Sequence, residues 1–587
     1  MDRKTIIAFI LVGIVIIFMP YYQQMVNPQE ATPAVQQEAD KAEDTYIPEE
    51  PREPVKTEPK IKTRDISVES KEVVIVNDKY AMVLSNLGGG TVRGYQLYEY
   101  EGPDGDPVQL IPEDASANLN ISYTNIYQDV SDLENRAFDC AQLDNMESGD
   151  TLFVKHKNTL SYTIETEEGI QLEKRFTFYP HRYDFNMDVI ITDYLQKMAG
   201  LKYTVAWNDG FAITENNVSD DIMYSAVYAQ MGYELVKQEM KKVKNGEAET
   251  IKTNGQTDWL LFKSKYFSGF IAPRDEKGIR SELMLYKEDD KRDFTARIDM
   301  GLSKSNYQKN SFLIGLVPTE KALLSSYDME FEKTMNWGGK IIKPFSIALH
   351  WLLEFFYRLI PNYGVVILVI SVVIKIITYP LTHKSYSSMK RMQLVQPKIK
   401  ELQEKYKNNK QVLQQKTMEL YKKEKVNPMG GCLPMLLQLP LLYGLFIVFR
   451  TAIEFRGAPF MLWIQDLSAP DAMFSFGMNI PLLGSDFNLL PVLMTVLMVV
   501  QQKMSGNTNA GTPQQAQQQK MMMWLMPGML FFLFYNFPSG LVLYYLTFNA
   551  LTILQQKFII NKQVEESFSK SHPENVKAKS SGGKKRS

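Results

Sequence analysis

Cysteine and histidine are scarce in this chain of 587 residues. Its two cysteines, Cys140 and Cys432, are too few for a disulfide framework or a thiolate zinc site. The five histidines never stand three or four residues apart, which argues against a metal site on one helix. No phosphate-loop, HExxH or GxSxG motif occurs. The sequence therefore predicts no cofactor, no metal and no catalytic residue of a familiar soluble enzyme.

Charge is nearly balanced over the whole chain, with 65 basic and 67 acidic side chains, but it is unevenly distributed. Residues 5–353 carry 37 basic and 54 acidic side chains, whereas residues 381–430 carry twelve basic and four acidic ones. The long apolar segments lie at the N-terminus and after residue 360. This separation of charge from apolar segments indicates a protein built into a membrane.

Six apolar segments are predicted membrane spans, because only elements with closed hydrogen bonding are tolerated in hydrocarbon. The first, 5–22, ends in Pro20-Tyr21-Tyr22 and lacks a small-residue cleavage site, so we expect an uncleaved anchor. The other predicted spans are 363–381, 432–451, 487–503, 522–537 and 539–558. Several are shorter than the ~20 residues that a hydrocarbon core requires, so they should thin the bilayer locally.

The positive-inside rule predicts the orientation of these spans. Residues 381–430 have a net charge of +8, from twelve basic and four acidic side chains, and the basic tail 559–587 follows the last span. Both are therefore placed in the cytoplasm, together with the N-terminus. Residues 23–345 are placed outside.

The predicted outside region has two parts. Residues 23–65 contain six prolines among polar residues, which predicts a flexible linker. Residues 66–335 alternate short apolar runs with Gly, Asp and Asn turns, which predicts a large antiparallel β-sandwich. One predicted hairpin pairs residues 160–165 with 170–178, and Gly88-Gly89-Gly90 is interpreted as a turn.

Residues 337–360 predict an amphipathic helix in the membrane interface. Its predicted apolar positions are Phe345, Ala348, Leu349, Leu352, Phe355, Phe356 and Leu359. The predicted polar face contains Lys343, Ser346, His350, Glu354 and Arg358.

Residues 384–427 predict a helical hairpin with a turn at Asn408-Asn409 and a kink at Pro397. Met389, Met392, Val395, Ile399, Leu402 and Tyr406 form the predicted apolar stripe of its first limb. The basic surface suits anionic lipid headgroups or ribosomal RNA, and charge alone favours neither. The predicted contact residues are Lys390, Arg391, Lys398, Lys400, Lys405, Lys422 and Lys423.

Polar residues inside the predicted spans are the candidate functional site. Lys375 stands in an otherwise apolar run, where a charge costs about 2.5–3.5 kcal/mol on insertion scales. Ser371 lies one helical turn earlier. The other candidates are Gln438, Gln502, Tyr544, Tyr545, Asn549 and Thr552. If these side chains converge they form a hydrophilic cavity; snorkelling of Lys375 to the cytoplasmic interface is the alternative.

Ordered motifs between residues 335 and 560 resemble the YidC family of membrane protein insertases. They include Tyr379-Pro380-Leu381-Thr382, Gln396-Pro397-Lys398-Ile399, Val426-Asn427-Pro428, Ala458-Pro459-Phe460, Asp466-Leu467-Ser468 and Phe537-Pro538-Ser539-Gly540. The β-rich region resembles the periplasmic domain of the family more weakly. Bacterial members usually have arginine where this chain has Lys375, which keeps the charge but loses the planar guanidinium.

The resemblance implies an α-helical polytopic protein of the cell inner membrane, with five core helices around a groove open to cytoplasm and lipid. It implies a non-enzymatic insertase and chaperone for nascent membrane proteins, acting alone or with the Sec translocon, including SecDF. It also implies ribosome binding through the hairpin and tail, and function as a monomer. Ser371, Gln438, Tyr544 and Tyr545 fall at positions that resemble groove-lining positions of the family.

Two other functions are compatible with the polar residues. Ser371 and Lys375 could form a Ser-Lys dyad of an intramembrane or signal-type peptidase, although no oxyanion donors are evident. Lys375 could instead belong to a solute transporter, which would leave the basic hairpin and tail unexplained.

Overall fold

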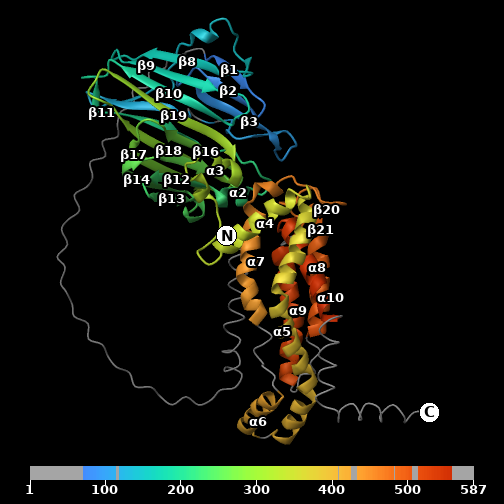
Figure 1. Ribbon diagram of the computed structural model, residues 1–587. Coiled ribbons are helices and arrows are strands. Elements are labelled where there is room, and N and C mark those ends of the chain that lie inside the picture. The colour runs from blue at the N-terminus through green and yellow to red at the C-terminus, as the bar shows by residue number, and fades with distance from the viewer. Residues whose placement is uncertain are drawn as a thin grey trace, which may run out of the picture. The chain divides into compact units, whose positions relative to one another are not determined.

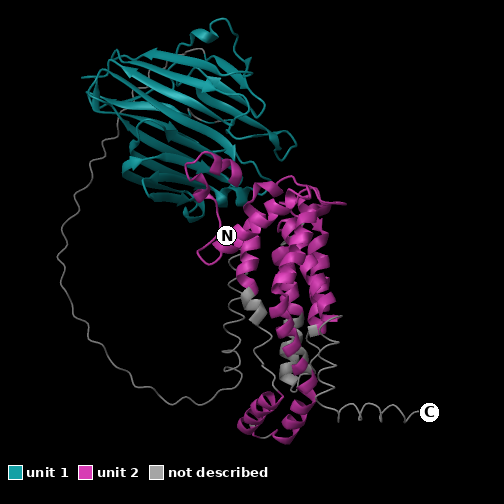
Figure 2. Cartoon of the chain, in the orientation of Figure 1, with its two compact units in different colours: residues 1–318 teal, residues 319–587 magenta. Residues whose placement is uncertain are grey.

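The structure, a computed structural model, describes residues 70–113, 115, 118–407, 409–424, 433–480, 483–505 and 513–557. Three predicted segments lie outside the described residues: the anchor 5–22, the linker 23–65 and the tail 559–587. The chain divides into two compact units, residues 1–318 and 319–587, which Figure 2 colours separately. The first unit is built from strands and the second mainly from helices (Figure 1).

The described residues of the first unit form three sheets. The eight-stranded sheet has, in spatial order, β13 (Glu234–Glu239), β12 (Ala226–Met231), β15 (Trp259–Lys263), β16 (Phe267–Pro273), β19 (Tyr307–Pro318), β10 (Asp184–Thr192), β9 (Gln171–Phe178) and β8 (Asn158–Glu165). The six-stranded sheet has β14 (Glu247–Thr257), β17 (Gly278–Glu288), β18 (Lys291–Gly301), β11 (Met198–Trp207), β5 (Asn120–Asn125) and β6 (Val130–Asp132). The five-stranded sheet has β4 (Pro107–Gln109), β3 (Thr91–Glu101), β2 (Tyr80–Ser85), β1 (Glu72–Val76) and β7 (Asp150–Phe153).

Aromatic side chains join the two larger sheets. Phe262 of β15 packs against Trp207 of β11 and Phe294 of β18, with ring centroids 4.7 and 5.5 Å apart. All three side chains are buried, as expected where the apolar faces of two sheets meet. The prediction of a β-rich domain is confirmed.

One strand pair departs from the antiparallel arrangement predicted for the β-sandwich. β1 pairs with β7 in parallel, with Val73 opposite Asp150 and Val76 opposite Phe153. Parallel neighbours need a long crossover connection, and the whole of β2 to β6 lies between these two strands in the sequence. Alternation within a strand does not indicate the direction of its partner.

The turn at Gly88-Gly89-Gly90 agrees with its prediction. All three glycines have positive φ angles, of 66°, 68° and 90°. A Cβ at Gly90 would lie 2.3 Å from a ring carbon of Phe176, so the turn needs glycine for space as well as conformation. Lys174 Nζ, fully buried, donates to Gly88 O at 2.8 Å and to Leu119 O at 2.9 Å. This lysine therefore supports the turn from inside the fold.

A buried ion pair fixes the short helix α2 (Val218–Tyr224). Arg292 Nη2 lies 3.1 Å from Asp221 Oδ2, and both side chains are completely buried. The backbone amides of Thr214 and Lys265 also donate to the Asp221 carboxylate. Such a pair is stable only because several hydrogen bonds replace lost hydration.

The second unit contains α3 (Lys321–Ser326), η3 (Phe331–Thr334), α4 (Lys343–Tyr357), α5 (Tyr363–Lys405), α6 (Lys410–Lys423), α7 (Leu433–Thr451), η5 (Ile453–Phe455), β20 (Ala472–Ile480), β21 (Gly484–Asn488), α8 (Leu489–Ser505), α9 (Pro513–Phe534) and α10 (Ser539–Gln555). A helix occupies each of the five predicted spans after residue 360. Of the described helices, α5 is the one with a segment long and apolar enough to cross a membrane, at Tyr363–Ser388. Shorter apolar helices lie at Gln438–Thr451, Leu489–Met504 and Trp524–Phe534.

Helix α5 is longer than predicted. The sequence separates a span at 363–381 from a hairpin limb at 384, but the structure has one helix of 43 residues that continues through Pro380 and Pro397. Each proline removes one backbone donor, and neighbouring polar groups and packing can compensate for this loss in membrane helices. The end of the apolar run near residue 381 is therefore not the end of the helix.

The faces of α4 also differ from the prediction. Ser346, Leu349, His350 and Leu353 are its buried residues, whereas Phe345 and Phe355 are exposed. Two residues of the predicted polar face thus face the protein. A helix beside a membrane can direct apolar side chains to lipid, so the apolar stripe does not identify the packed face.

Two glycines bring the helices of the second unit close to its loops. A Cβ at Gly364 would lie 2.0 Å from Cδ2 of Phe460, and one at Gly540 would lie 3.1 Å from Leu467 O. Ser539 Oγ donates to Asp466 O at 2.8 Å and Gly540 N donates to Leu467 O at 3.0 Å. Two motifs that are distant in the sequence, around residues 466 and 538, are therefore bonded directly to each other.

Candidate functional site

Lys375 is buried in the helical unit, on the side of α5 that faces α10. Its exposed fraction is 7%, and Ser371 one turn earlier is fully buried. The opposite side of the helix exposes apolar residues, with Ile376 and Ile377 each 67% exposed. A helix with its polar side inward and its apolar side outward is suited to a lipid surrounding.

Thr552 of α10 binds the ammonium group of Lys375. Lys375 Nζ donates to Thr552 Oγ1 at 2.7 Å, and the Thr552 hydroxyl donates to Phe548 O at 2.7 Å. The same Nζ lies 4.5 Å from the centroid of the Phe548 ring. One turn of α10 therefore supplies both an oxygen acceptor and an aromatic face to the cation. This arrangement holds Lys375 inside the helical unit, which argues against snorkelling as its only role.

Further polar contacts follow the same helix pair toward its C-terminal end. Gln555 Nε2 donates to Thr382 Oγ1 at 3.4 Å. The side chains of Gln501 and Gln556 lie next to the Tyr386 hydroxyl. Together with the lysine–threonine pair, these contacts form a polar ladder between α5 and α10, with α8 contributing Gln501. The sequence analysis missed Thr382, Tyr386, Gln555 and Gln556; the spacing of seven and four residues along α5, from Lys375 to Thr382 and on to Tyr386, could have indicated the first two.

Three predicted residues leave polar atoms without partners near this ladder. The hydroxyls of Tyr544 and Tyr545 and the Nδ2 atom of Asn549 are buried and have no hydrogen-bond partner among the described residues. Tyr544 stacks on Phe548, with ring centroids 5.8 Å apart, which places it beside the aromatic face that Lys375 contacts. Buried polar groups without partners are costly, so water or a polar ligand is expected at such atoms.

The remaining predicted residues are less closely connected. Gln438 lies half-buried on α7, and Gln502 lies half-buried on α8. No polar contact joins Gln438 to Lys375 in the part of the chain that the structure describes. The Ser371 hydroxyl donates to Ile367 O at 2.7 Å and the Lys375 ammonium donates to Thr552. A Ser-Lys dyad would need the amine to accept the serine proton, so the structure does not assemble the predicted peptidase pair.

The helical hairpin is formed by the end of α5 and by α6. Val395 and Ile399 are buried, with Met392, Leu420 and Tyr421 packed around them. Lys398 Nζ lies 2.7 Å from Glu424 Oε1 and joins the two limbs. Asn409 caps α6 by accepting from Val412 N at 3.2 Å, and Asn408 lies outside the described residues.

The predicted contact residues of the hairpin differ in exposure. Arg391, Lys405, Lys422 and Lys423 are exposed, and Lys398 and Lys400 are half-buried. The side chain of Lys390 lies outside the described part of the chain. Four cations are thus available on the surface, while Lys398 is engaged in the ion pair.

Arg450, which the sequence analysis did not select, lies in the last turn of α7. It is 6% exposed, and its guanidinium lies 5.2 Å from the Phe446 ring and 5.7 Å from the Phe537 ring. The cation–π contacts connect α7 to the motif that begins α10. Its position at a helix end made it resemble an ordinary interface residue in the sequence.

The chain is similar to known proteins over nearly its whole length. A family described as YidC periplasmic domain matches residues 72–352, and one described as 60Kd inner membrane protein matches residues 355–567. The chain is 30% identical over 574 residues to the membrane protein insertase YidC of Chlorobaculum parvum, covering 95% of this chain and 94% of that protein. With its counterpart from Chlorobium phaeovibrioides it shares 30% identity over 607 residues, covering 100% of both. A crystal structure of an active YidC insertase with its first transmembrane domain resolved shares 18% identity, with a TM-score of 0.35, over 84% of this chain and 93% of that one.

Proposed function

Because the chain belongs to the YidC family of membrane protein insertases with a periplasmic domain, we propose that it inserts nascent proteins through a hydrophilic groove centred on Lys375. Membership of this family establishes that the chain is an inner-membrane insertase and not an enzyme. The observation that carries the groove is the buried Lys375–Thr552 hydrogen bond, with the unpartnered polar atoms of Tyr544, Tyr545 and Asn549 nearby.

The groove lowers the cost of moving a polar tail across the bilayer. Polar groups along α5 and α10 hold water, which shortens the hydrocarbon path that the tail must cross. The Lys375 ammonium attracts acidic residues of the tail, and this attraction is stronger in a partly dehydrated site than in bulk water. The apolar segment of the substrate then passes into lipid, driven by burial of its own apolar surface. We include Ser371, Gln438 and Gln502 in the groove lining.

The proposed topology has six spans: the anchor 5–22 and the five helices after residue 360. Both termini and the hairpin 384–427 lie in the cytoplasm, and residues 66–335 lie in the periplasm with an interfacial helix at 337–360. The net charge of +8 on residues 381–430 supports this orientation. The short apolar helices at Leu489–Met504 and Trp524–Phe534 support local thinning of the bilayer.

The proposed partners follow from the exposed cations of the hairpin. Arg391, Lys405, Lys422 and Lys423 contact ribosomal RNA or anionic lipid through their charges. We further propose that the protein works as a monomer, alone or beside the Sec translocon including SecDF.

Insertion into liposomes tests the groove. Purified protein is reconstituted, and a single-span substrate with an acidic translocated tail is synthesised on ribosomes outside. Protease protection of the full-length tail, above that in empty liposomes, is the expected result. Lys375→Ala should reduce protection of the acidic tail more than that of a matched neutral tail, and Lys375→Arg should restore it. Equal protection of both tails by all three proteins would exclude the charge from the mechanism.

A further inference from the structure

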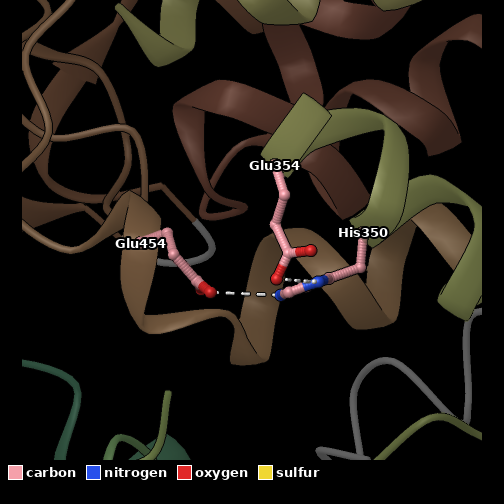
Figure 3. A group of neighbouring side chains, drawn as sticks. All are labelled: His350, Glu354 and Glu454. Atoms are coloured by element: carbon pink, nitrogen blue, oxygen red, sulfur yellow. Dashed lines mark hydrogen bonds and ion pairs between the residues drawn. The ribbon is translucent and has the colours of Figure 1, made fainter. Parts of the chain in front are cut away.

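A histidine and two glutamates from distant parts of the sequence meet in the helical unit (Figure 3). His350 and Glu354 are one turn apart on α4, and Glu454 lies in η5, 104 residues after His350. His350 Nε2 lies 3.1 Å from Glu454 Oε1, and His350 Nδ1 lies 3.4 Å from Glu354 Oε1. One nitrogen or oxygen atom from each residue lies within 4.8 Å of the other two.

The histidine is buried, whereas the glutamates reach the surface. The His350 side chain is 3% exposed, and the Trp337 ring packs edge-on against it at a centroid distance of 5.2 Å. The Glu354 and Glu454 side chains are 31% and 18% exposed. This combination gives one buried imidazole and two carboxylates that a ligand can reach from the surface.

The cluster has unmet polar atoms and uncompensated charge. His350 Nδ1 and Glu454 Oε2 are buried and have no hydrogen-bond partner among the described residues. Among the residues that the structure describes, neither Glu354 nor Glu454 forms an ion pair with a lysine or an arginine. Partly buried carboxylates are normally paired with a cation or coordinate a metal ion, because removing part of their charge from water is costly.

We propose that His350, Glu354 and Glu454 bind one divalent transition-metal ion, for which Zn²⁺ is well suited. Imidazole nitrogen and carboxylate oxygen are both common zinc ligands, and three protein ligands leave a fourth position for water on the exposed side. The ion's two positive charges balance the two carboxylates. Bound there, the ion fastens α4 to η5. In the proposed topology, helix α4 lies at the periplasmic interface, so the site would face the ions of that compartment.

Metal titration of the full-length protein in lipid nanodiscs tests this site. The protein is treated with chelator, desalted and titrated with Zn²⁺ by calorimetry and with Co²⁺ by visible absorption. We expect one Zn²⁺ per chain and the visible absorption band of Co²⁺ bound in a low-symmetry nitrogen–oxygen site. His350→Gln and Glu454→Gln should each weaken Zn²⁺ binding by at least about tenfold, since each removes a direct ligand.

Matched variants separate the cluster from other binding sites. His383→Gln removes a histidine on α5, and Glu332→Gln removes a half-buried glutamate of η3; both should bind Zn²⁺ like the wild type. Zn²⁺ should also slow hydrogen exchange of residues 343–357 in the wild type and not in Glu454→Gln. If His350→Gln does not fold, Glu354→Gln replaces it, because the Glu354 carboxylate is the most exposed of the three.

The proposal is overturned if Zn²⁺ and Co²⁺ bind the wild type no more tightly than the Glu454→Gln and Glu354→Gln variants. It is also overturned if slow exchange of residues 343–357 depends on pH but not on Zn²⁺ or chelator. A protonated imidazole shared by the two carboxylates would then explain the cluster. These measurements do not depend on insertion activity, so failure of the groove proposal would leave their interpretation unchanged.

Discussion

Lys375 and Thr552 lie 177 residues apart in the sequence, yet Lys375 Nζ donates to Thr552 Oγ1 at 2.7 Å. The bond connects the first core helix, α5, to the last, α10. It therefore closes the helical unit on itself and at the same time positions its buried charge.

Replacing the acceptor should weaken both properties. In Thr552→Val the ammonium loses its oxygen partner, and a hydrogen bond to a charged group is worth about 1.5–3 kcal/mol. We expect thermal unfolding of the purified protein at a lower temperature and reduced insertion of the acidic-tail substrate. Thr552→Ser, which keeps the hydroxyl, should restore both. Unchanged stability and insertion in Thr552→Val would show that the bond is dispensable.

A methyl group at Gly364 should disturb the packing of the loop that contains Phe460. The added Cβ would lie 2.0 Å from Phe460 Cδ2, and overpacking of this kind costs about 1–3 kcal/mol. Gly364→Ala should therefore lower the unfolding temperature, and Phe460→Leu in the same chain should recover part of the loss. Gly339→Ala is the matched control, because nothing lies within 4 Å of its added Cβ. Equal unfolding temperatures for the two alanine variants would contradict the crowding.

Lys174 should make the stability of the β-rich unit depend on pH. Complete burial lowers the pKa of Lys174 from 10.5 to about 7. Between these values the unfolded chain binds the proton and the folded chain does not, so the free energy of unfolding should rise as pH increases from 7 to 10.5. Denaturant unfolding across this range measures the slope. Lys174→Met should have a smaller slope, and identical slopes in the two proteins would refute the assignment.

Breaking the buried Arg292–Asp221 pair should strongly destabilise the β-rich unit. Asp221→Ala leaves a completely buried guanidinium without its carboxylate, which costs about 3–5 kcal/mol. Glu167→Ala is the control, because its pair with Arg136 is solvent-exposed and contributes only about 0–1 kcal/mol. Denaturant midpoints of the three proteins give the comparison. A loss in Asp221→Ala no larger than that in Glu167→Ala would contradict this account.

Ribosome binding should depend on the exposed cations of the hairpin. Replacing Arg391, Lys405, Lys422 and Lys423 together by glutamine should weaken binding. The binding constant K falls as salt rises. The plot of log K against log salt should become shallower, by up to about 0.7–0.9 in slope for each RNA phosphate that the variant no longer neutralises. Co-sedimentation with ribosomes over a salt series measures this.

The control is a variant with four exposed lysines of the β-rich unit replaced by glutamine, at Lys155, Lys157, Lys244 and Lys304. This variant has the same charge change at a different place, so its salt slope should equal that of the wild type. Equal salt slopes in both variants would mean that the hairpin does not bind the ribosome.

Sequence analysis can find polar residues that stand inside apolar runs. Lys375, Asn549 and Thr552 are conspicuous because each is polar within an apolar run, and the structure brings all three to the α5–α10 pair or its immediate surroundings. Gln555 and Gln556 were not selected, because polar residues are ordinary where a span ends. Their contacts with Thr382 and Tyr386 depend on which helices pack together, and periodicity within one helix does not contain that information.

The same limit explains the other differences. Strand alternation predicted β1 but not its parallel partner β7, because direction is a property of the pair. The amphipathic pattern predicted α4 but placed His350 on the polar face that was expected to point away from the protein. The structure buries His350 instead, because lipid accepts an apolar helix face as readily as a protein core does. The convergence of His350 with Glu454 arises only after α4 and η5 pack, so no local spacing could indicate it.

Because α5 is one continuous helix, its two ends are connected mechanically. At 1.5 Å per residue its 43 residues form a rod of about 65 Å, with Lys375 about 18 Å from one end. Ile399, in the small core of the hairpin, lies about 36 Å beyond Lys375 along the same axis. If the rod pivots at its first turn, where Phe460 packs against Gly364, a push on the hairpin moves Lys375 by about one third of the displacement at Ile399. Docking of a ribosome on the hairpin, as proposed above, would then move the buried charge by a smaller distance than the hairpin itself.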